Sequence, residues 1–272
     1  MARGAAYQPG RKLIGLDIDG TIITHAGELH PRVRDAIRAV AGAGHHVVIA
    51  TGRSVVATMP ILELLGIASG YAVCSNGAVT LRIDPRRKRG YKVIDKVTFD
   101  PEPALTLLRA ELPDALVAVE VLGRGFLVSS PFPEGELGGE QKVVPWERLL
   151  ERRATRVTLR MPDTEPDAFM AHIERIGLHE VSYAVGWTAW LDINPEGVSK
   201  GSALELLRRR LGVEPGDTVA VGDQRNDIEM LRWAARGVAM GNAPDEVKAV
   251  ADEVTADVHQ AGLADVLESL LR

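Results

Sequence analysis

Short apolar runs alternate with stretches of helical periodicity at both ends of the chain. Because these runs lack strict alternation and are spaced by helices, they predict a parallel sheet that is covered on both faces. In chain order the expected elements are the strand KLIGLDI, a helix at 31–43, the strand HVVIA, a helix at 54–65, the strand YAVCS and, after a long interval, a helix at 199–211, the strand DTVAVG, a helix at 226–235, the short strand GVAM and helices at 245–251 and 262–271.

The interval from about residue 84 to residue 190 follows a different pattern. Two successive units of strand, helix, strand and strand occur there, the first beginning with YKVIDKV and the second with TRVTLRM. This order predicts an α+β insert with an antiparallel sheet. We therefore expect an α/β protein with a Rossmann-like parallel sheet core at 11–83 and 191–272, and an inserted α+β cap domain at 84–190.

The composition excludes several classes of protein. A hydrophobic fraction of 46%, a charged fraction of 25% and a mean hydropathy of zero argue against both membrane-embedded and disordered chains. The formal net charge of −5 offers no general basic face for nucleic acid or for a membrane surface. A single cysteine, Cys74, excludes an internal disulfide, and no apolar run resembles a signal peptide, so we expect a cytoplasmic protein.

The string LIGLDIDGTII is the first candidate for chemistry. Asp17 and Asp19 stand two residues apart directly after an apolar strand, so their side chains share a face if the strand continues, and Gly20 allows the chain to turn. Ligands of α/β folds bind at the carboxyl ends of parallel strands, where this pair would lie. A lone Asp-Gly dipeptide would more often be a capped loop.

A second acidic pair follows a second apolar strand in VAVGDQRNDIEM. Asp227 comes four residues after Asp223, so both point toward one site if a helix begins near Asn226. Four carboxylates at two strand ends repel one another unless a cation neutralises them, and a hard divalent ion with oxygen ligands, Mg²⁺ above all, meets that need. The alternative is that these acids are solvated loop residues.

Two further strings offer groups that suit a phosphate. ATGRS ends a core strand with the hydroxyl of Thr51 and the amide of Gly52 ahead of a helix. GVSKGSAL places Lys200 at a helix start, where a cation opposes the helix dipole and needs an anionic partner. Taken singly, each string is also compatible with an ordinary helix entry or a solvated lysine.

Taken in order, DIDGT, ATGR, VSKGSAL and GDQRNDIEM resemble motifs one to four of the haloacid dehalogenase superfamily. SNGA at 75–78 is similar to a step of its Cof-like, class IIB sugar-phosphatase branch. The resemblance covers 11–83 and 191–272, and that branch carries a large α/β cap between motifs two and three. The insert at 84–190 itself matches no motif, so the resemblance assigns no substrate-recognising residue there.

The resemblance implies a separate role for each of these residues. Asp17 would be the nucleophile that takes the phosphoryl group, and Asp19 would protonate the leaving oxygen and then activate water. Asp227 would anchor Lys200 or a metal-bound water. For Mg²⁺ binding the resemblance implies Asp17, the Asp19 carbonyl, Asp223 and Asp227. For phosphate binding it implies Thr51, the Gly52 amide, Lys200 and Asn226. Arg53 and Asn76 would make contacts at the rim of the site, although a surface or turn position is an equal alternative for each.

These roles predict a Mg²⁺-dependent phosphatase that acts on a small phosphorylated metabolite, such as a sugar phosphate, through an aspartyl phosphate. A phosphomutase of the same superfamily is the first alternative, since nothing in the sequence excludes it. A non-catalytic phosphometabolite sensor is disfavoured because Asp17 and Asp19 are both present. We expect no nucleic-acid or membrane partner, and the sequence leaves a homodimer open.

Overall fold

The computed structural model describes residues 10–176, 181–185 and 189–272. Its described residues divide into two compact units. One, which we call the core unit, is drawn from residues 1–52, 60–95 and 199–272, and the other, the cap unit, from 53–59 and 96–198. No helix in the described part of the chain is long and apolar enough to cross a membrane.

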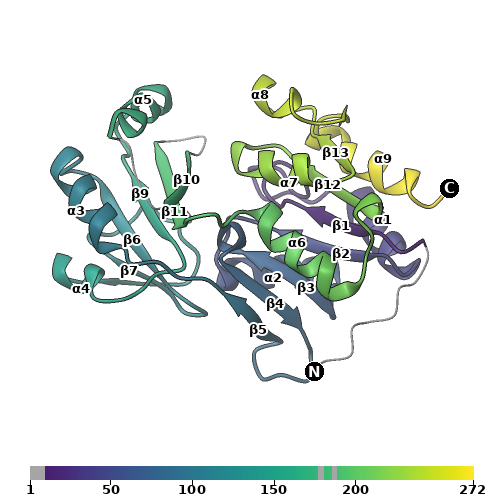
Figure 1. Cartoon of the computed structure of the whole chain (residues 1–272), viewed down its shortest axis with the longest axis horizontal. Helices are drawn as coiled ribbons and strands as arrows, with labels where there is room; N and C mark the ends of the chain where they lie inside the picture. Colours follow the sequence, from purple (N-terminus) through teal and green to yellow (C-terminus); the bar gives the residue numbers. More distant parts are fainter. Residues whose placement is uncertain (1–9, 177–180, 186–188) are drawn as a thin grey trace. The chain divides into compact units, whose positions relative to one another are not determined.

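An eight-stranded sheet, counted over the described residues, forms the centre of the core unit (Figure 1). Its strands from β14 to β3 are parallel, and β4 runs antiparallel to β3. Leu16 lies beside Val221 on one neighbouring strand and beside Ile49 on the other. The spatial order is β14 (Glu253–Val254), β13 (Arg236–Ala239), β12 (Thr218–Gly222), β1 (Leu13–Leu16), β2 (His46–Ala50), β3 (Gly70–Cys74), β4 (Val79–Ile83) and β5 (Tyr91–Lys96).

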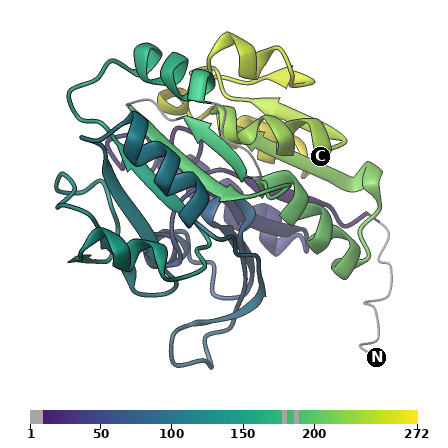
Figure 2. The ribbon, with the colours of Figure 1, turned by 60° about the vertical axis from the view of Figure 1, so that its left-hand side comes forward.

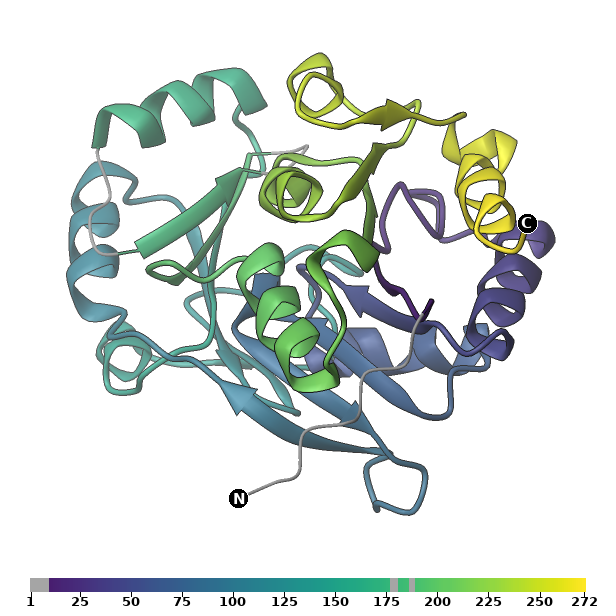
Figure 3. The same ribbon diagram turned by 45° about the vertical axis from the view of Figure 1, so that its right-hand side comes forward.

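Helices accompany this sheet, as the spacing of apolar runs predicts. Leu204 and Leu207 of α6 and Met230 of α7 share a buried cluster with Leu13 and Ala220 of the sheet. Helices α1 and α9 lie side by side (Figure 3). The helices are α1 (Pro31–Gly42), α2 (Val55–Leu65), of which residues 55–59 are assigned to the cap unit, α6 (Lys200–Leu211), α7 (Ile228–Trp233), α8 (Asp245–Lys248) and α9 (Gly262–Ser269). The predicted α/β class with a largely parallel sheet is therefore confirmed.

Local chemistry fixes both ends of α6, the helix that carries Lys200. At its start the Ser199 hydroxyl accepts from the Ser202 amide at 3.1 Å, and the Ser202 hydroxyl accepts from the Ser199 amide at 2.9 Å. This reciprocal cap satisfies two amides that the first helical turn leaves without partners. At its end Gly212 has a φ of 67°, a conformation that glycine adopts without steric penalty.

The strand at 91–96 departs from the sequence prediction. It was expected within the insert, but β5 is the edge strand of the core sheet. The Asp84 amide donates to the Gly90 carbonyl, which closes a turn between β4 and β5. The chain therefore extends the sheet before leaving it, and the insert begins after β5. The short strands β4, β8 and β14 were not anticipated either.

The cap unit has its own sheet, six-stranded over the described residues, and carries three helices on one face (Figure 2). Leu105 of α3 and Phe169 of α5 pack there against Val117, Leu159 and Ile193. The spatial order is β10 (Val181–Val185), β11 (Trp190–Pro195), β9 (Val157–Arg160), β6 (Leu116–Val121), β7 (Gly125–Val128) and β8 (Glu140–Val143), with α3 (Glu102–Glu111), α4 (Trp146–Leu150) and α5 (Pro166–Ile176).

One pair of cap strands differs from the antiparallel sheet that the sequence predicts. Strand β8 runs parallel to β7, with Gly125 beside Glu140 and Val128 beside Val143. The loop at 129–139 carries the chain back to the start of β7 before β8 begins. Phe132 and Leu137 of that loop pack with Phe126, so the connection covers part of the sheet face that has no helices.

Candidate active site

Asp17 lies at the end of β1, in the middle of the core sheet. Its amide donates to the Val221 carbonyl of β12 at 3.1 Å, so the chain still follows the sheet where the acidic residues begin. Asp223 follows the end of β12 in the same way. Because β1 and β12 are adjacent and parallel, their carboxyl ends bring the two motifs to one edge.

Lys200 joins these motifs through two short hydrogen bonds. Its Nζ donates to Oδ1 of Asp17 at 2.6 Å and to Oδ1 of Asp227 at 2.7 Å. The lysine side chain is fully buried, at 0% exposure. Burial alone lowers the pKa of Lys200, but the charges of Asp17 and Asp227 outweigh it and raise that pKa above its usual value. The ammonium is therefore charged at neutral pH.

Asp227 also holds the loop that precedes it. Its Oδ2 accepts from the amides of Asp223 and Gln224, each at 2.9 Å. A Cβ at Gly222 would lie 2.5 Å from the Asp227 Cγ, so only glycine leaves room for this carboxylate. Of the two roles left open for Asp227, contact with Lys200 is the one seen in this geometry.

Three side chains donate hydrogen bonds to the Asp223 carboxylate. Its Oδ1 accepts from the Thr21 hydroxyl at 2.9 Å, and its Oδ2 accepts from Gln224 Nε2 at 3.1 Å and Asn242 Nδ2 at 3.3 Å. Burial, followed by the charge of Asp227, raises the pKa of Asp223 to about 7. Gly20 has a φ of 80°, and a Cβ there would lie 2.2 Å from Asp223 Oδ2.

Burial also shifts the pKa of Asp17. Burial raises its pKa well above the usual range, Lys200 opposes that shift, and the neighbouring carboxylates of Asp227, Asp223 and Asp19 add to it. Both strand-end carboxyls are thus costly to ionise without a further cation. Such perturbed groups gathered at the ligand-binding edge of a sheet are typical of a functional site.

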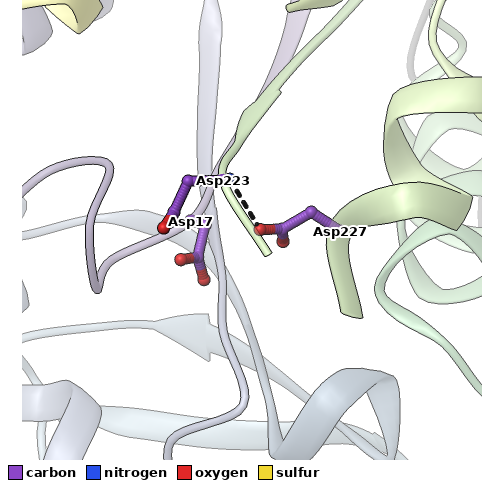
Figure 4. A group of neighbouring side chains, drawn as sticks. All are labelled: Asp17, Asp223 and Asp227. Atoms are coloured by element: carbon purple, nitrogen blue, oxygen red, sulfur yellow. Dashed lines mark hydrogen bonds between the residues drawn. The ribbon is translucent and has the colours of Figure 1, made fainter. Parts of the chain in front are cut away.

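A metal ion fits this group of residues. Within the described parts of the chain, Asp17, Asp223 and Asp227 each offer a carboxylate oxygen, and these atoms lie within 4.8 Å of one another (Figure 4). All three residues are buried, and the dashed line marks the bond from the Asp223 amide to Asp227. One ammonium leaves three buried carboxylates with net negative charge, which a divalent cation with oxygen ligands would neutralise.

Asp19 takes a different position from this trio. It is half-buried, and its carboxylate is not among the three that share the potential metal position in the described chain. The resemblance assigned its backbone carbonyl, not its side chain, to the metal. The proton-transfer role that the sequence suggests for the Asp19 side chain is separate from metal binding and stays a prediction.

Gly52, Asn76 and Asn226 lie together beside Thr51. Asn226 Nδ2 donates to Asn76 Oδ1 at 3.0 Å, and a Cβ at Gly52 would lie 2.9 Å from the same Asn76 oxygen. The Asn76 amide donates to the Thr51 carbonyl at 3.0 Å, with Asn76 at a φ of 52°. The structure therefore brings three predicted phosphate-binding positions, Thr51, Gly52 and Asn226, together with the predicted rim residue Asn76. Arg53 belongs to the cap unit.

Sequence reasoning missed three residues that hold the carboxylates in place. Thr21 and Gln224 contact Asp223 directly. Asn242 bonds Asp223, donates to the Gly20 carbonyl at 2.9 Å and accepts from the Val258 amide at 3.0 Å. It thereby joins three loops at the same sheet edge. The sequence did carry a signal for it, because Asn242 directly follows the predicted strand GVAM and a glycine.

Comparison with known proteins shows the family to which this chain belongs. Residues 14–267 match a family described as haloacid dehalogenase-like hydrolase. The chain is 32% identical over 274 residues to YkrA of Bacillus subtilis strain 168. That alignment covers 95% of this chain and 97% of YkrA. It is 28% identical over 284 residues to the pyridoxal phosphate phosphatase YbhA of Escherichia coli K12, covering 96% of this chain and 98% of YbhA.

A solved structure gives an independent comparison of the fold. The structure of the subclass IIB sugar phosphatase BT4131 of the same superfamily aligns with a TM-score of 0.81. The alignment covers 95% of this chain and 98% of that chain at 22% sequence identity. At this identity the likeness shows the fold alone, and the family match confirms the predicted superfamily.

Proposed function

Because the chain belongs to the haloacid dehalogenase-like hydrolase family and is a phosphoric monoester hydrolase, we propose that it is a Mg²⁺-dependent phosphatase of small phosphorylated metabolites. The observation that carries the proposal is the fully buried Lys200 ammonium, which bonds Asp17 and Asp227 beside a third carboxylate. Such a group of charges is costly to build for structure alone.

Asp17 acts as the nucleophile in this proposal. A carboxylate oxygen of Asp17 forms a bond to phosphorus, while the bond from phosphorus to the ester oxygen breaks. Asp19 gives its proton to the leaving oxygen, so the alcohol departs neutral. Asp19 then takes a proton from water as the water oxygen attacks phosphorus, which frees inorganic phosphate and restores Asp17.

Lys200 and the neighbouring amide groups stabilise the phosphoryl group during transfer. The Lys200 ammonium already contacts Asp17, so it lies beside the oxygens that gain charge as the new bond forms. Thr51, the Gly52 amide and Asn226 would bind the remaining phosphoryl oxygens. The bond between Asn226 and Asn76 holds the amide group of Asn226 in a fixed orientation.

Asp17, Asp223 and the carbonyl of Asp19 are the groups that we propose hold Mg²⁺. When bound, the ion neutralises the carboxylates and polarises the phosphoryl group. Thr21, Gln224 and Asn242 orient the Asp223 carboxylate toward this position, as residues behind a ligand commonly do. Both oxygens of Asp227 already accept hydrogen bonds, one from Lys200 and one from the amides at 223–224, so we propose that Asp227 supports these groups and is not a metal ligand.

The cap unit is the part of the chain to which we assign substrate choice. The pyridoxal phosphate and sugar phosphate of the two named phosphatases share a phosphate and differ in the alcohol. The groups that act on phosphate lie in the core unit, so recognition of the alcohol falls to the inserted residues after β5. A sugar phosphate or a related metabolite remains our proposed substrate class, with phosphoryl transfer between sugar positions as the alternative.

Phosphate release from a panel of phosphomonoesters, including p-nitrophenyl phosphate, tests the proposal. We expect activity with Mg²⁺, loss of activity in EDTA and recovery when Mg²⁺ is restored. Analysis of the organic products separates free alcohol from a sugar phosphate with its phosphoryl group moved. A folded sample that releases no phosphate from any member of the panel would contradict the phosphatase assignment.

A further inference from the structure

A cavity lined by exposed cations lies on the surface of the cap unit, and the mechanism does not use it. Its volume is about 220 Å³, and it is bordered by the β6–β7 turn, β8 and the segment that follows α4. Arg124, Lys142, Arg148 and Arg152 contribute positive charge, whereas Val121 and Leu127 provide part of an apolar floor. Glu140 and Glu151 are its acidic members.

A second cavity of about 140 Å³ adjoins the first and shares Val121, Leu127, Arg148 and Arg152 with it. Lys96 and Arg153 line it as well, together with Glu120. Six cationic side chains therefore face these linked cavities against three acidic ones. This local excess of positive charge contrasts with the formal net charge of −5 of the whole chain.

The acidic residues compensate only some of these cations. Arg148 bonds Glu151 at 2.5 Å, and Arg124 lies 3.9 Å from Glu140. Arg153 donates to the Thr98 carbonyl at 2.7 Å. Lys142 and Arg152 form no ion pair with any acidic group among the residues that the structure describes. These cations are exposed, and their gathering around one surface cavity creates a local positive potential that attracts anions.

We propose that this cavity, which we call the cap anion site, binds a small multiply phosphorylated anion. A phosphate offers oxygens in tetrahedral directions, so it can accept at once from cations on β8, on the β6–β7 turn and after α4. A carboxylate offers two oxygens in one plane and a single negative charge, so it matches cations that surround the cavity less well. The site consists of cap residues alone, and the proposal does not depend on the catalytic role of the core unit.

Tripolyphosphate is the probe for this site, used with metal-free protein so that the three core carboxylates repel the anion. Lys142→Gln/Arg152→Gln removes the two cations without acidic partners. Lys88→Gln/Arg89→Gln is the matched control, because it removes the same two charges from exposed positions between β4 and β5. Calorimetry should show binding weakened about tenfold or more in the first variant and changed less than about twofold in the control.

Amide NMR shifts locate the bound probe. Gly125 lines the cap anion site, whereas Gly52 lies in the core unit. We expect tripolyphosphate to move the Gly125 signal, to leave Gly52 in place and to move neither in Lys142→Gln/Arg152→Gln. If that double variant does not fold, Arg152→Gln alone should weaken binding about threefold. Equal affinities in both double variants, or a shift at Gly52 without one at Gly125, would overturn the cap anion site.

Discussion

The Nζ atom of Lys200 lies 2.6 Å from Oδ1 of Asp17, although the two residues are 183 positions apart in the chain. The same nitrogen reaches Asp227 at 2.7 Å, so one ammonium is shared by two carboxylates. None of these side chains is exposed enough for water to replace the contact. The pair links the start of α6 to the end of β1, and it couples the chemistry of the site to the stability of the core unit.

Replacing Lys200 by methionine should destabilise the protein strongly. Lys200→Met keeps the bulk of the side chain but leaves Asp17 and Asp227 buried without a cation. We expect a loss of about 3–5 kcal/mol in the free energy of unfolding, measured by urea denaturation of metal-free protein at pH 8. Lys92→Met on the exposed edge strand is the control and should change that free energy by less than about 0.5 kcal/mol. Equal effects would contradict a buried ionic link.

Asp17→Asn should abolish turnover and leave the fold intact. The amide fills the volume of the carboxyl but cannot attack phosphorus. Since burial already disfavours the charge of Asp17, the metal-free variant should melt no lower than the wild type. The measurements are phosphate release and a thermal melt in EDTA. A rate within tenfold of the wild type would remove Asp17 from the nucleophile's role.

Asp19→Asn should discriminate between leaving groups. An alkoxide needs a proton when it departs, whereas p-nitrophenolate needs little. The variant should therefore lose about 10²–10⁴-fold of its rate on an alkyl phosphate and less on p-nitrophenyl phosphate in single-turnover phosphorylation of Asp17. An equal loss on both substrates would argue that Asp19 acts by position or charge and not as a proton donor.

Metal affinity should rise with pH up to about 7. The pKa of Asp223 in the metal-free protein is about 7, above the value of about 3.9 for an unfolded chain, so the folded protein holds a proton that Mg²⁺ must displace. This raised pKa makes ionised Asp223 a destabilising group, so the metal-free protein should be less stable at pH 8 than at pH 6.

The measurement is the rise in melting temperature on adding Mg²⁺, which should be larger at pH 8 than at pH 6. Below pH 7, the affinity should fall by up to about tenfold per pH unit for each proton displaced. In Asp223→Asn this pH dependence should weaken, with the remainder due to Asp17, whose pKa is raised in the same direction. A Mg²⁺ effect that is independent of pH would contradict the linkage.

Asn242→Ala should weaken metal binding without removing a proposed ligand. The variant loses the contact with Asp223 and the bond to the Gly20 carbonyl. We expect the Mg²⁺ concentration for half-maximal activity to rise about 10–100-fold. Asn242→Asp serves as a comparison, because it keeps the acceptor for the Val258 amide but removes the donor. If the alanine variant alone were impaired, the role of Asn242 would be to hold the loops rather than Asp223.

The sequence by itself determined the core fold and the identity of its chemical groups. Apolar runs of four to five residues specify the buried strands β1, β2 and β12, because parallel strands covered on both faces need no polar side. The acidic residues follow β1 and β12 directly in the sequence, and parallel strands bring their carboxyl ends to one edge. Local spacing was therefore enough to predict that Asp17 and Asp223 would meet.

Tertiary structure decided the features that depend on pairs far apart in sequence. The residues of β5 are all half-buried or exposed, which suits an edge strand of either sheet, so only strand pairing could place it in the core. The partners of Asp227 and the contact of Asn242 with Asp223 are likewise set by loops that meet only after folding. Hydrophobic periodicity records whether a residue is buried, but it contains no information on which distant residue lies beside it.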